Sequence, residues 1–216
     1  MKKKDLSKYG QYKNDIFNKL DVDFKKGNNI LDVGCGEGSD AEIFINEYGL
    51  DVYGIDIYEH NNVKNITGLK FKKGEIYNIP FQDCVFDYVF LHDVLHHIDE
   101  ENQSHDKHIE GLKELDRVLK IGGNIIIVEG NRYNPLFYPH MVKMRRHNHW
   151  MQSYFIKTVK EVFNNEKYET RFQFFESHLY PQKFIRFWKL YEFFMEKFAS
   201  NNFLAYNIAF IKKIIL

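Results

Sequence analysis

A short apolar strand that runs directly into a glycine-rich loop constrains this fold more than any other feature of the sequence. Residues 29–33 have the composition of a buried strand, and Gly34, Gly36 and Gly38 follow at alternate positions. Glycine permits a tight turn out of a strand and lets a ligand lie against the backbone. Dinucleotide-binding loops space their glycines as G-x-G-x-x-G, so the alternating pattern disfavours NAD as the ligand.

Strand-like and helical segments alternate after this loop. Most of the strand segments are apolar, and glycines follow the helical ones. Such alternation with short turns predicts parallel strands joined by right-handed crossovers, which is a doubly wound α/β sheet. Ligands of these sheets lie beyond the carboxyl ends of the strands. The predicted strands are 51–56, 69–73, 86–91 and 124–129, and the predicted helices are 39–48 and 109–119.

The chain changes character near residue 130, where aromatic side chains become frequent. Residues 131–216 hold 22 of the 36 aromatic residues. Periodicity predicts helices at 153–163 and 181–199 and strands at 169–176 and 203–212. In the second helix a stripe of Phe and Trp lies opposite a charged face. Such a helix is typical of core packing, but it also suits a dimer face, a lid over an apolar substrate or shallow contact with a membrane surface.

Composition excludes several classes of function. Lys+Arg and Asp+Glu both total 30, so no overall basic field indicates nucleic acid as a partner. Neither a secretory signal nor a run of about 18 uncharged apolar residues is present. The two cysteines, Cys35 and Cys84, cannot build a disulfide framework. A reduced, cytoplasmic protein is expected, with the aromatic helix as its one candidate contact to a membrane surface. The oligomeric state is not indicated.

Two acidic residues stand where an adenosine ligand would need them. Asp56 ends the second predicted strand, 20 residues after Gly36. A carboxylate there can accept both ribose hydroxyls of a nucleoside. Glu75 follows the third strand and can accept a hydrogen bond from an adenine amine.

Five segments with familiar spacings resemble a known enzyme family, the class I S-adenosylmethionine-dependent methyltransferases of the type 11, small-molecule branch. The resemblance covers about residues 28–130. It implies a seven-stranded Rossmann-like sheet of order 3-2-1-4-5-7-6 with the last strand antiparallel, and it makes the aromatic helix an insertion between strands six and seven. The segments are ILDVGCGEG (30–38), YGIDI (53–57), FKKGEIYNIPF (71–81), FDYVFLHDVLHHI (86–98) and LKELDRVLKIGGNIIIVE (112–129).

One domain is therefore expected over residues 1–216. Residues 1–27, with an amphipathic helix at 7–20, would form a helical cap. Residues 28–130 would form the cofactor-binding core, and residues 131–216 would supply the acceptor side and the last strands.

The resemblance implies S-adenosylmethionine as cofactor and S-adenosylhomocysteine as product. The methionine and ribose end would be lined by Asp32, Gly34, Cys35 and Gly36, and the ribose hydroxyls and the adenine would be held by Asp56, Ile57, Glu75 and Ile76. The methionine would also be faced, from just past the fourth strand, by Leu91 and His92. The amino-terminal helix would close over the cofactor with Tyr9 and Tyr12. The family usually has aspartate where this chain has Glu75.

His96 and His97 are the candidate catalytic residues. They begin the segment after the fourth strand, near the expected methyl position. Histidine is the natural base at neutral pH, and a base is needed only if the acceptor has a proton to lose. Packing or helix capping is the alternative role for one of them. No histidine or cysteine spacing resembles a metal-ligand pattern, so no metal is expected.

The acceptor of the methyl group is expected to be a small molecule, of a lipid-like, isoprenoid or aromatic kind, methylated on oxygen, nitrogen or carbon. Residues that leave the fifth strand at its carboxyl end could reach it, and the arginines among them would suit an anionic group. The alternative is a scaffold or regulator that binds the cofactor without transfer. The candidate acceptor residues are Asn131, Arg132, Tyr133, His140, Arg145 and Arg146.

Overall fold

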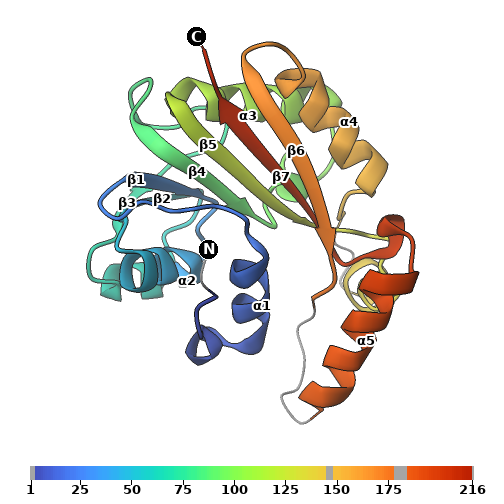
Figure 1. The fold of residues 1–216 in the computed structure, drawn as a ribbon. Coiled ribbons are helices and arrows are strands. Elements are labelled where there is room, and N and C mark those ends of the chain that lie inside the picture. The colour runs from blue at the N-terminus through green and yellow to red at the C-terminus, as the bar shows by residue number, and fades with distance from the viewer. Residues whose placement is uncertain (1–2, 145–147, 178–183, 216) are drawn as a thin grey trace.

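The computed structural model describes residues 3–144, 148–177 and 184–215, except for the side chain of His140 (Figure 1). All seven strands join one sheet in the order β3-β2-β1-β4-β5-β7-β6. The first five strands run parallel, and β7 is antiparallel to both of its neighbours. The predicted order and the reversed last strand are therefore confirmed. The strands are β1 (Asn29–Val33), β2 (Asp51–Asp56), β3 (Lys70–Lys73), β4 (Phe86–His92), β5 (Leu119–Gly130), β6 (Tyr168–Phe175) and β7 (Tyr206–Lys213).

Helices cover both faces of the sheet. On one face lie α1 (Gln11–Lys19) and α2 (Ser39–Ile43), and on the other lie α3 (His105–Val118) and α4 (Gln152–Phe163) (Figure 1). Successive side chains of a strand point to opposite faces, and a sheet covered on both faces buries both sets. In β4, Phe90 packs in the cluster of α1 and α2, whereas Val89 packs in the cluster of α3 and α4.

Several element boundaries differ from those predicted by periodicity. The helix expected at 7–20 is broken by Gly10, whose φ of 98° is not helical, so a 3-10 turn at Ser7–Tyr9 precedes α1. Helix α3 begins at His105, ahead of the predicted start at residue 109. The prediction began too late because the first residues of the helix are polar and give no apolar periodicity. Strand β5 begins at Leu119, which pairs with Phe86 ahead of an irregularity in the β4–β5 register.

The aromatic helix is α5 (Ile185–Phe198), and it lies between β6 and β7 as predicted. It projects beyond the end of the sheet rather than covering a face (Figure 1). The first residues predicted for this helix, 181–183, lie outside the described part of the chain. Among the residues that the structure describes, every helix is too short or too polar to cross a membrane.

The charged face of α5 is the inward one. Lys189 donates to Asp15 of α1 and to Glu192, which is itself buried. The phenylalanines are turned to solvent, with Phe187 60% and Phe198 69% exposed, whereas Trp188 and Tyr191 are half-buried. This helix is therefore not a core element of the described structure.

Candidate cofactor and acceptor site

The glycine loop leaves β1 at the carboxyl edge of the sheet and is tied to the neighbouring strand. The backbone N–H of Gly34 donates to the carbonyl of Ile55 at 2.8 Å. Gly34 has a φ of 69°, and a Cβ there would lie 2.6 Å from a methyl of Val94, so only glycine fits. Gly36, with a φ of 52°, has nothing within 4 Å of the position a Cβ would take. The loop is thus packed at Gly34 and open at Gly36.

Asp56 ends β2 directly beside this open position. Its Oδ2 accepts a hydrogen bond from the Gly36 N–H at 2.9 Å, and its Oδ1 accepts one from the Tyr58 N–H at 3.0 Å. The next side chain, Ile57, is 49% exposed and offers an apolar surface at the same edge. The structure thus brings together the loop, Asp56 and Ile57, as the sequence predicted.

Asp32 supplies a buried acceptor beneath the loop. Its side chain is 2% exposed, and Oδ2 has no hydrogen-bond partner among the described residues. Burial, followed by the carboxylate of Asp40, raises the pKa of Asp32 well above its ordinary value. A buried acceptor without a partner is costly, so a ligand that donates a hydrogen bond here is favoured. The amino group of a methionine moiety has that chemistry.

The adenine side is less enclosed. Gly74 N–H donates to the Asp56 carbonyl at 3.0 Å, which sets the turn that follows β3 against the end of β2. Glu75 is exposed on this turn, and Ile76 is half-buried against α3.

Three residues of the predicted cofactor set do not present their side chains to this space. Cys35 is buried, and its Sγ packs under β2, where a Cβ on Gly54 would meet it at 3.0 Å. Leu91 lies within β4 and is fully buried among residues of the α3 face. Tyr9 donates to Glu47 at 3.2 Å. Cys35 and Leu91 could contribute only backbone atoms, since their side chains fill the core.

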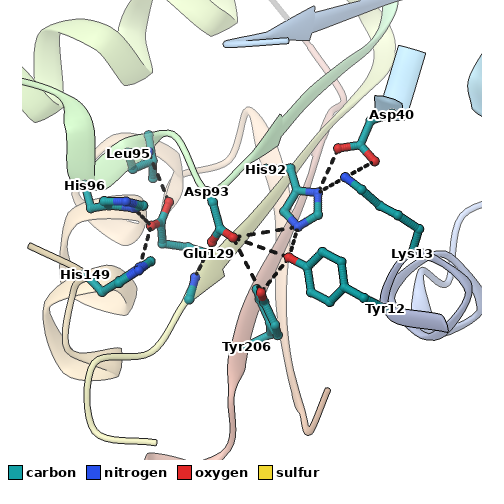
Figure 2. A network of polar contacts seen from close by, with 11 residues as sticks. Tyr12, Lys13, Asp40, His92, Asp93, Leu95, His96, Glu129, His149 and Tyr206 are labelled. Carbon is teal, nitrogen blue, oxygen red and sulfur yellow. Dashed lines mark hydrogen bonds and ion pairs between the residues drawn. The ribbon is translucent and has the colours of Figure 1, made fainter. Parts of the chain in front are cut away.

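A hydrogen-bonded network joins α1 and α2 to the end of β4 (Figure 2). His92 Nδ1 lies 2.8 Å from Asp40 Oδ2, and His92 Nε2 lies 2.8 Å from the Tyr12 hydroxyl. Lys13 donates to the other oxygen of Asp40 at 2.7 Å. Burial alone would raise the pKa of Asp40, but the charge of Lys13 and the hydrogen bonds with Lys13 and His92 outweigh it and lower that pKa. A charged Asp40 therefore orients the imidazole.

Asp93 extends this network toward β7. It has a φ of 56°, and its Oδ1 accepts a hydrogen bond from the Gly130 N–H at 2.8 Å. Its Oδ2 lies 3.4 Å from the Tyr12 hydroxyl and 3.5 Å from that of Tyr206. The two tyrosine hydroxyls lie 2.6 Å apart. Residues from both ends of the chain thus meet at the carboxyl edge of the central strands.

The two candidate catalytic histidines are separated by the structure. His96 is 1% exposed, and its Nδ1 is hydrogen-bonded to the buried Glu129, with His149 alongside (Figure 2). The ring of His96 is enclosed in this structure, and an acceptor-side role for it stays a prediction. His97 is exposed and lies 3.4 Å from Glu100.

The predicted acceptor residues also include both buried and exposed side chains. Asn131 is fully buried and donates to the carbonyls of Asn202 and Leu204, so its side chain does not line an open space. Arg132 is half-buried and Tyr133 is 47% exposed. Arg145 and Arg146 lie outside the described residues, as does the side chain of His140.

Six polar residues of this site were not predicted from the sequence. They come from six separate segments, and only the fold brings them together. Glu129 carried a signal that could have marked it, since a carboxylate ends a strand that is otherwise apolar. The six are Lys13, Asp40, Asp93, Glu129, His149 and Tyr206.

Comparisons with known proteins agree with this geometry. Residues 31–127 match the family model described as a methyltransferase domain. The chain is 27% identical over 148 residues to phosphoethanolamine N-methyltransferase 2 of Caenorhabditis elegans, which covers 65% of this chain and 31% of that protein. It is 30% identical over 118 residues to the demethylmenaquinone methyltransferase of Staphylococcus saprophyticus, which covers 50% of this chain and 47% of that protein.

The fold itself has close counterparts among solved structures. A S-adenosylmethionine-dependent methyltransferase of Archaeoglobus fulgidus is 20% identical, with a TM-score of 0.59 over 88% of this chain and 87% of that one. The chain spans less than half the length of the two relatives in the sequence comparison. The matched family, the strand order and the glycine loop agree on one conclusion. Residues 31–127 belong to a class I methyltransferase domain whose cofactor is S-adenosylmethionine.

Proposed function

We propose that this chain transfers a methyl group from S-adenosylmethionine to oxygen, nitrogen or carbon of a small acceptor molecule. One observation carries the proposal above all. The open Gly36 of the loop is hydrogen-bonded to Asp56, and the polar network around His92 lies at the same edge of the sheet. A cofactor site and a group able to handle a proton are thereby adjacent.

Four side chains would hold the cofactor in this proposal. Asp32, with its buried Oδ2, would accept from the amino group of the methionine moiety. Asp56 would accept the ribose hydroxyls while keeping its bond to Gly36. Ile57 and Glu75 would pack against the adenine and read its edge. When bound, the cofactor supplies a methyl group made electrophilic by the sulfonium.

The Tyr12–His92 pair would serve the acceptor. Asp40 accepts from Nδ1–H of His92, which leaves Nε2 as the acceptor of the Tyr12 hydroxyl proton. Positioning supplies much of the acceleration of an in-line displacement. An acceptor that loses a proton on methylation would pass it to this pair. This role replaces the one that the sequence assigned to His96.

The acceptor is proposed to be lipid-like, isoprenoid or aromatic, with the enzyme working at a membrane surface. The exposed face of α5 presents Phe187, Phe194 and Phe198, while Arg186 and Lys197 are exposed on the same helix. Apolar side chains flanked by cations favour the interface of an anionic bilayer. This substrate class rests on the helix and is separate from the evidence for cofactor binding.

The proposal is tested first at Asp56. Asp56→Ala should weaken binding of S-adenosylhomocysteine by about tenfold or more in a calorimetric titration, since each lost hydrogen bond to a charged group contributes about 1.5–3 kcal/mol. Asp51→Ala is the matched control, because Asp51 lies on the same strand but is exposed and pairs with Lys70 at 3.0 Å. Equal affinity in the two variants would remove Asp56 from the cofactor site.

Transfer itself separates an enzyme from a scaffold that only binds the cofactor. The chain should move a labelled methyl group from S-adenosylmethionine to a component of a lipid extract, or to phosphoethanolamine or demethylmenaquinone. Cofactor binding without transfer to any acceptor across soluble and lipid extracts would favour the scaffold.

The membrane proposal is tested with vesicles. Wild type should sediment with vesicles that contain anionic phospholipid, and the double variant Phe187→Ser, Phe194→Ser should remain in the supernatant. Ile121→Ser removes an apolar side chain of similar exposure at the far end of β5 and should sediment as wild type does. Loss of sedimentation in Ile121→Ser, or its retention in the double variant, would contradict a role for α5.

A further inference from the structure

A second group of polar side chains lies beside the proposed methyl-transfer site and shares Asp93 with it. Asp93 follows β4, His96 lies in the 3-10 turn Leu95–His97, and Glu129 is near the end of β5. His149 comes from the segment just before α4. Figure 2 shows these four side chains gathered at the carboxyl edge of β4 and β5.

Their donor atoms converge on one point. One ligand atom from each residue lies within 4.8 Å of those of all the others. Glu129 Oε1 is hydrogen-bonded to His96 Nδ1 and lies 3.9 Å from His149 Nδ1. Ligands of a tetrahedral zinc ion lie roughly 3.4 Å apart. A modest closing of the side chains around an ion would reach that spacing.

Burial makes this arrangement unusual. His96, Glu129 and His149 are 1%, 0% and 3% exposed, and Asp93 is the member that borders the Tyr12 network. In the described ranges 3–144, 148–177 and 184–215, no lysine or arginine forms an ion pair with Glu129 or Asp93. Carboxylates withdrawn from water are normally paired or bound to a metal.

The backbone holds the two acids in place. Glu129 Oε2 accepts from the Leu95 N–H at 3.0 Å, and Asp93 Oδ1 accepts from the Gly130 N–H at 2.8 Å. The other oxygen of Glu129 faces His96, whereas the other oxygen of Asp93 lies near the hydroxyls of Tyr12 and Tyr206. Second interactions of this kind orient carboxylate ligands in metal sites.

We propose that Asp93, His96, Glu129 and His149 bind one divalent transition-metal ion, with Zn²⁺ as the best match. Two imidazoles and two carboxylates are ligands that zinc accepts in four-coordinate sites. The ion would tie the segment before α4 to the ends of β4 and β5, and so form one wall of the acceptor space. The ligands lie at positions 93, 96, 129 and 149, a spacing that matches no local metal motif.

The binding test uses the full chain without a polyhistidine tag. After removal of metal with a chelator, Zn²⁺ should bind with one ion per chain and submicromolar affinity in a calorimetric titration. His149→Gln and Glu129→Gln should each weaken binding by about tenfold or more. His105→Gln is the matched control, since it removes a histidine that faces Glu161 at 2.9 Å outside the cluster.

Spectroscopy makes the test independent of how well the variants fold. Co²⁺ in the wild-type chain should give the intense visible absorption of tetrahedral coordination, and Zn²⁺ should abolish it. Absence of one-to-one binding in wild type, or a His149→Gln variant that binds as tightly as His105→Gln, would overturn the proposal. Neither measurement uses a methyl donor, so failure of metal binding would leave the proposed methyl transfer standing. Failure of methyl transfer would likewise leave the metal site standing.

Discussion

The Tyr12 hydroxyl contacts residues that are far apart in the chain. It lies 2.8 Å from His92 Nε2, 2.6 Å from the hydroxyl of Tyr206 and 3.4 Å from Asp93. Burial, followed by the carboxylate of Asp93, raises the pKa of Tyr12 well above its ordinary value. The phenol therefore stays protonated at neutral pH and can donate to His92. Tyr12 of α1 thus connects the amino-terminal helix to the end of β4 and the start of β7.

Tyr12→Phe should destabilise the fold and slow methyl transfer. The substitution takes one hydrogen-bond partner from His92 and from Tyr206, so the free energy of unfolding should fall by about 1–2 kcal/mol in urea denaturation. Tyr9→Phe is the control, because among the described residues the Tyr9 hydroxyl is hydrogen-bonded to Glu47, which lies outside the network. That change should stay within about 0.5 kcal/mol. Wild-type stability and turnover in Tyr12→Phe would refute a role for the pair.

Asp40 should make the fold sensitive to acid. Its folded-state pKa is below the unfolded value of about 3.9, so its contribution to stability is present above that pH and is lost as the pH falls below it. Asp40→Asn should therefore be less stable than wild type at pH 6, and the difference should shrink toward pH 3. Urea denaturation across this range measures it, with the exposed Asp51→Asn as the reference. A difference that does not change with pH would show that Asp40 titrates alike in both states.

At the scale of elements, α5 has the amphipathic pattern of a core helix but the reverse orientation. Lys19 of α1 pairs with Glu196, and Lys189 pairs with Asp15, so the charged face is held against α1. The phenylalanines of α5 face outward as a result, whereas Trp188 and Tyr191 are half-buried. A helical stripe of Phe predicts one apolar face, but it does not predict which neighbour, if any, covers that face. The ion pairs to α1 decide the orientation.

Two phenylalanine substitutions distinguish a buried from an exposed helix face. Phe155→Ala in α4 removes a fully buried ring and should lower the free energy of unfolding by about 3–5 kcal/mol. Phe187→Ala in α5 removes a ring that is 60% exposed and should change it by less than about 0.5 kcal/mol. Chemical denaturation at protein concentrations far below those that favour association provides both values. A large loss in Phe187→Ala would mean that α5 is covered in solution.

At the scale of the whole molecule, parallel pairing brings the functional segments to one edge. The strands β1, β2, β4 and β5 all end there, so the glycine loop, Asp56, His92 and Glu129 become neighbours. The antiparallel β7 adds Tyr206 to the same edge because its amino end pairs with the carboxyl end of β5. The pairing of the strands therefore determines where the candidate site lies.

Ligand binding at this edge should stabilise the whole domain. S-adenosylhomocysteine at about 100 times its dissociation constant should add about 2.7 kcal/mol, which corresponds to a Tm rise of about 5–10 °C for a chain of this size. Differential scanning fluorimetry measures the shift. NAD at the same concentration should leave Tm unchanged, and Asp56→Ala should lose most of the rise. A rise with NAD alone would contradict the assigned cofactor.

Predictions from the sequence succeeded where the signal was local. Apolar or alternating segments marked most of the strands, and Gly36 and Asp56 lie together at the carboxyl edge of the sheet as their positions at strand ends suggested. The structure departs from expectation at residues whose surroundings depend on distant partners. His96 and Asn131 follow strands as site residues do, yet both are buried by segments more than 30 residues away.

The sequence by itself determined the strands, the glycine turns and the carboxylates at strand ends, since each of these signals lies in a few adjacent residues, and its resemblance to a known family implied the order of the sheet. Only the tertiary structure decided which polar side chains meet. The Tyr12–His92–Asp93–Tyr206 network and the cluster of His96, Glu129 and His149 join segments that no periodicity relates. Their contacts depend on which strands are paired and which helices pack across them, and that information is spread over the whole chain.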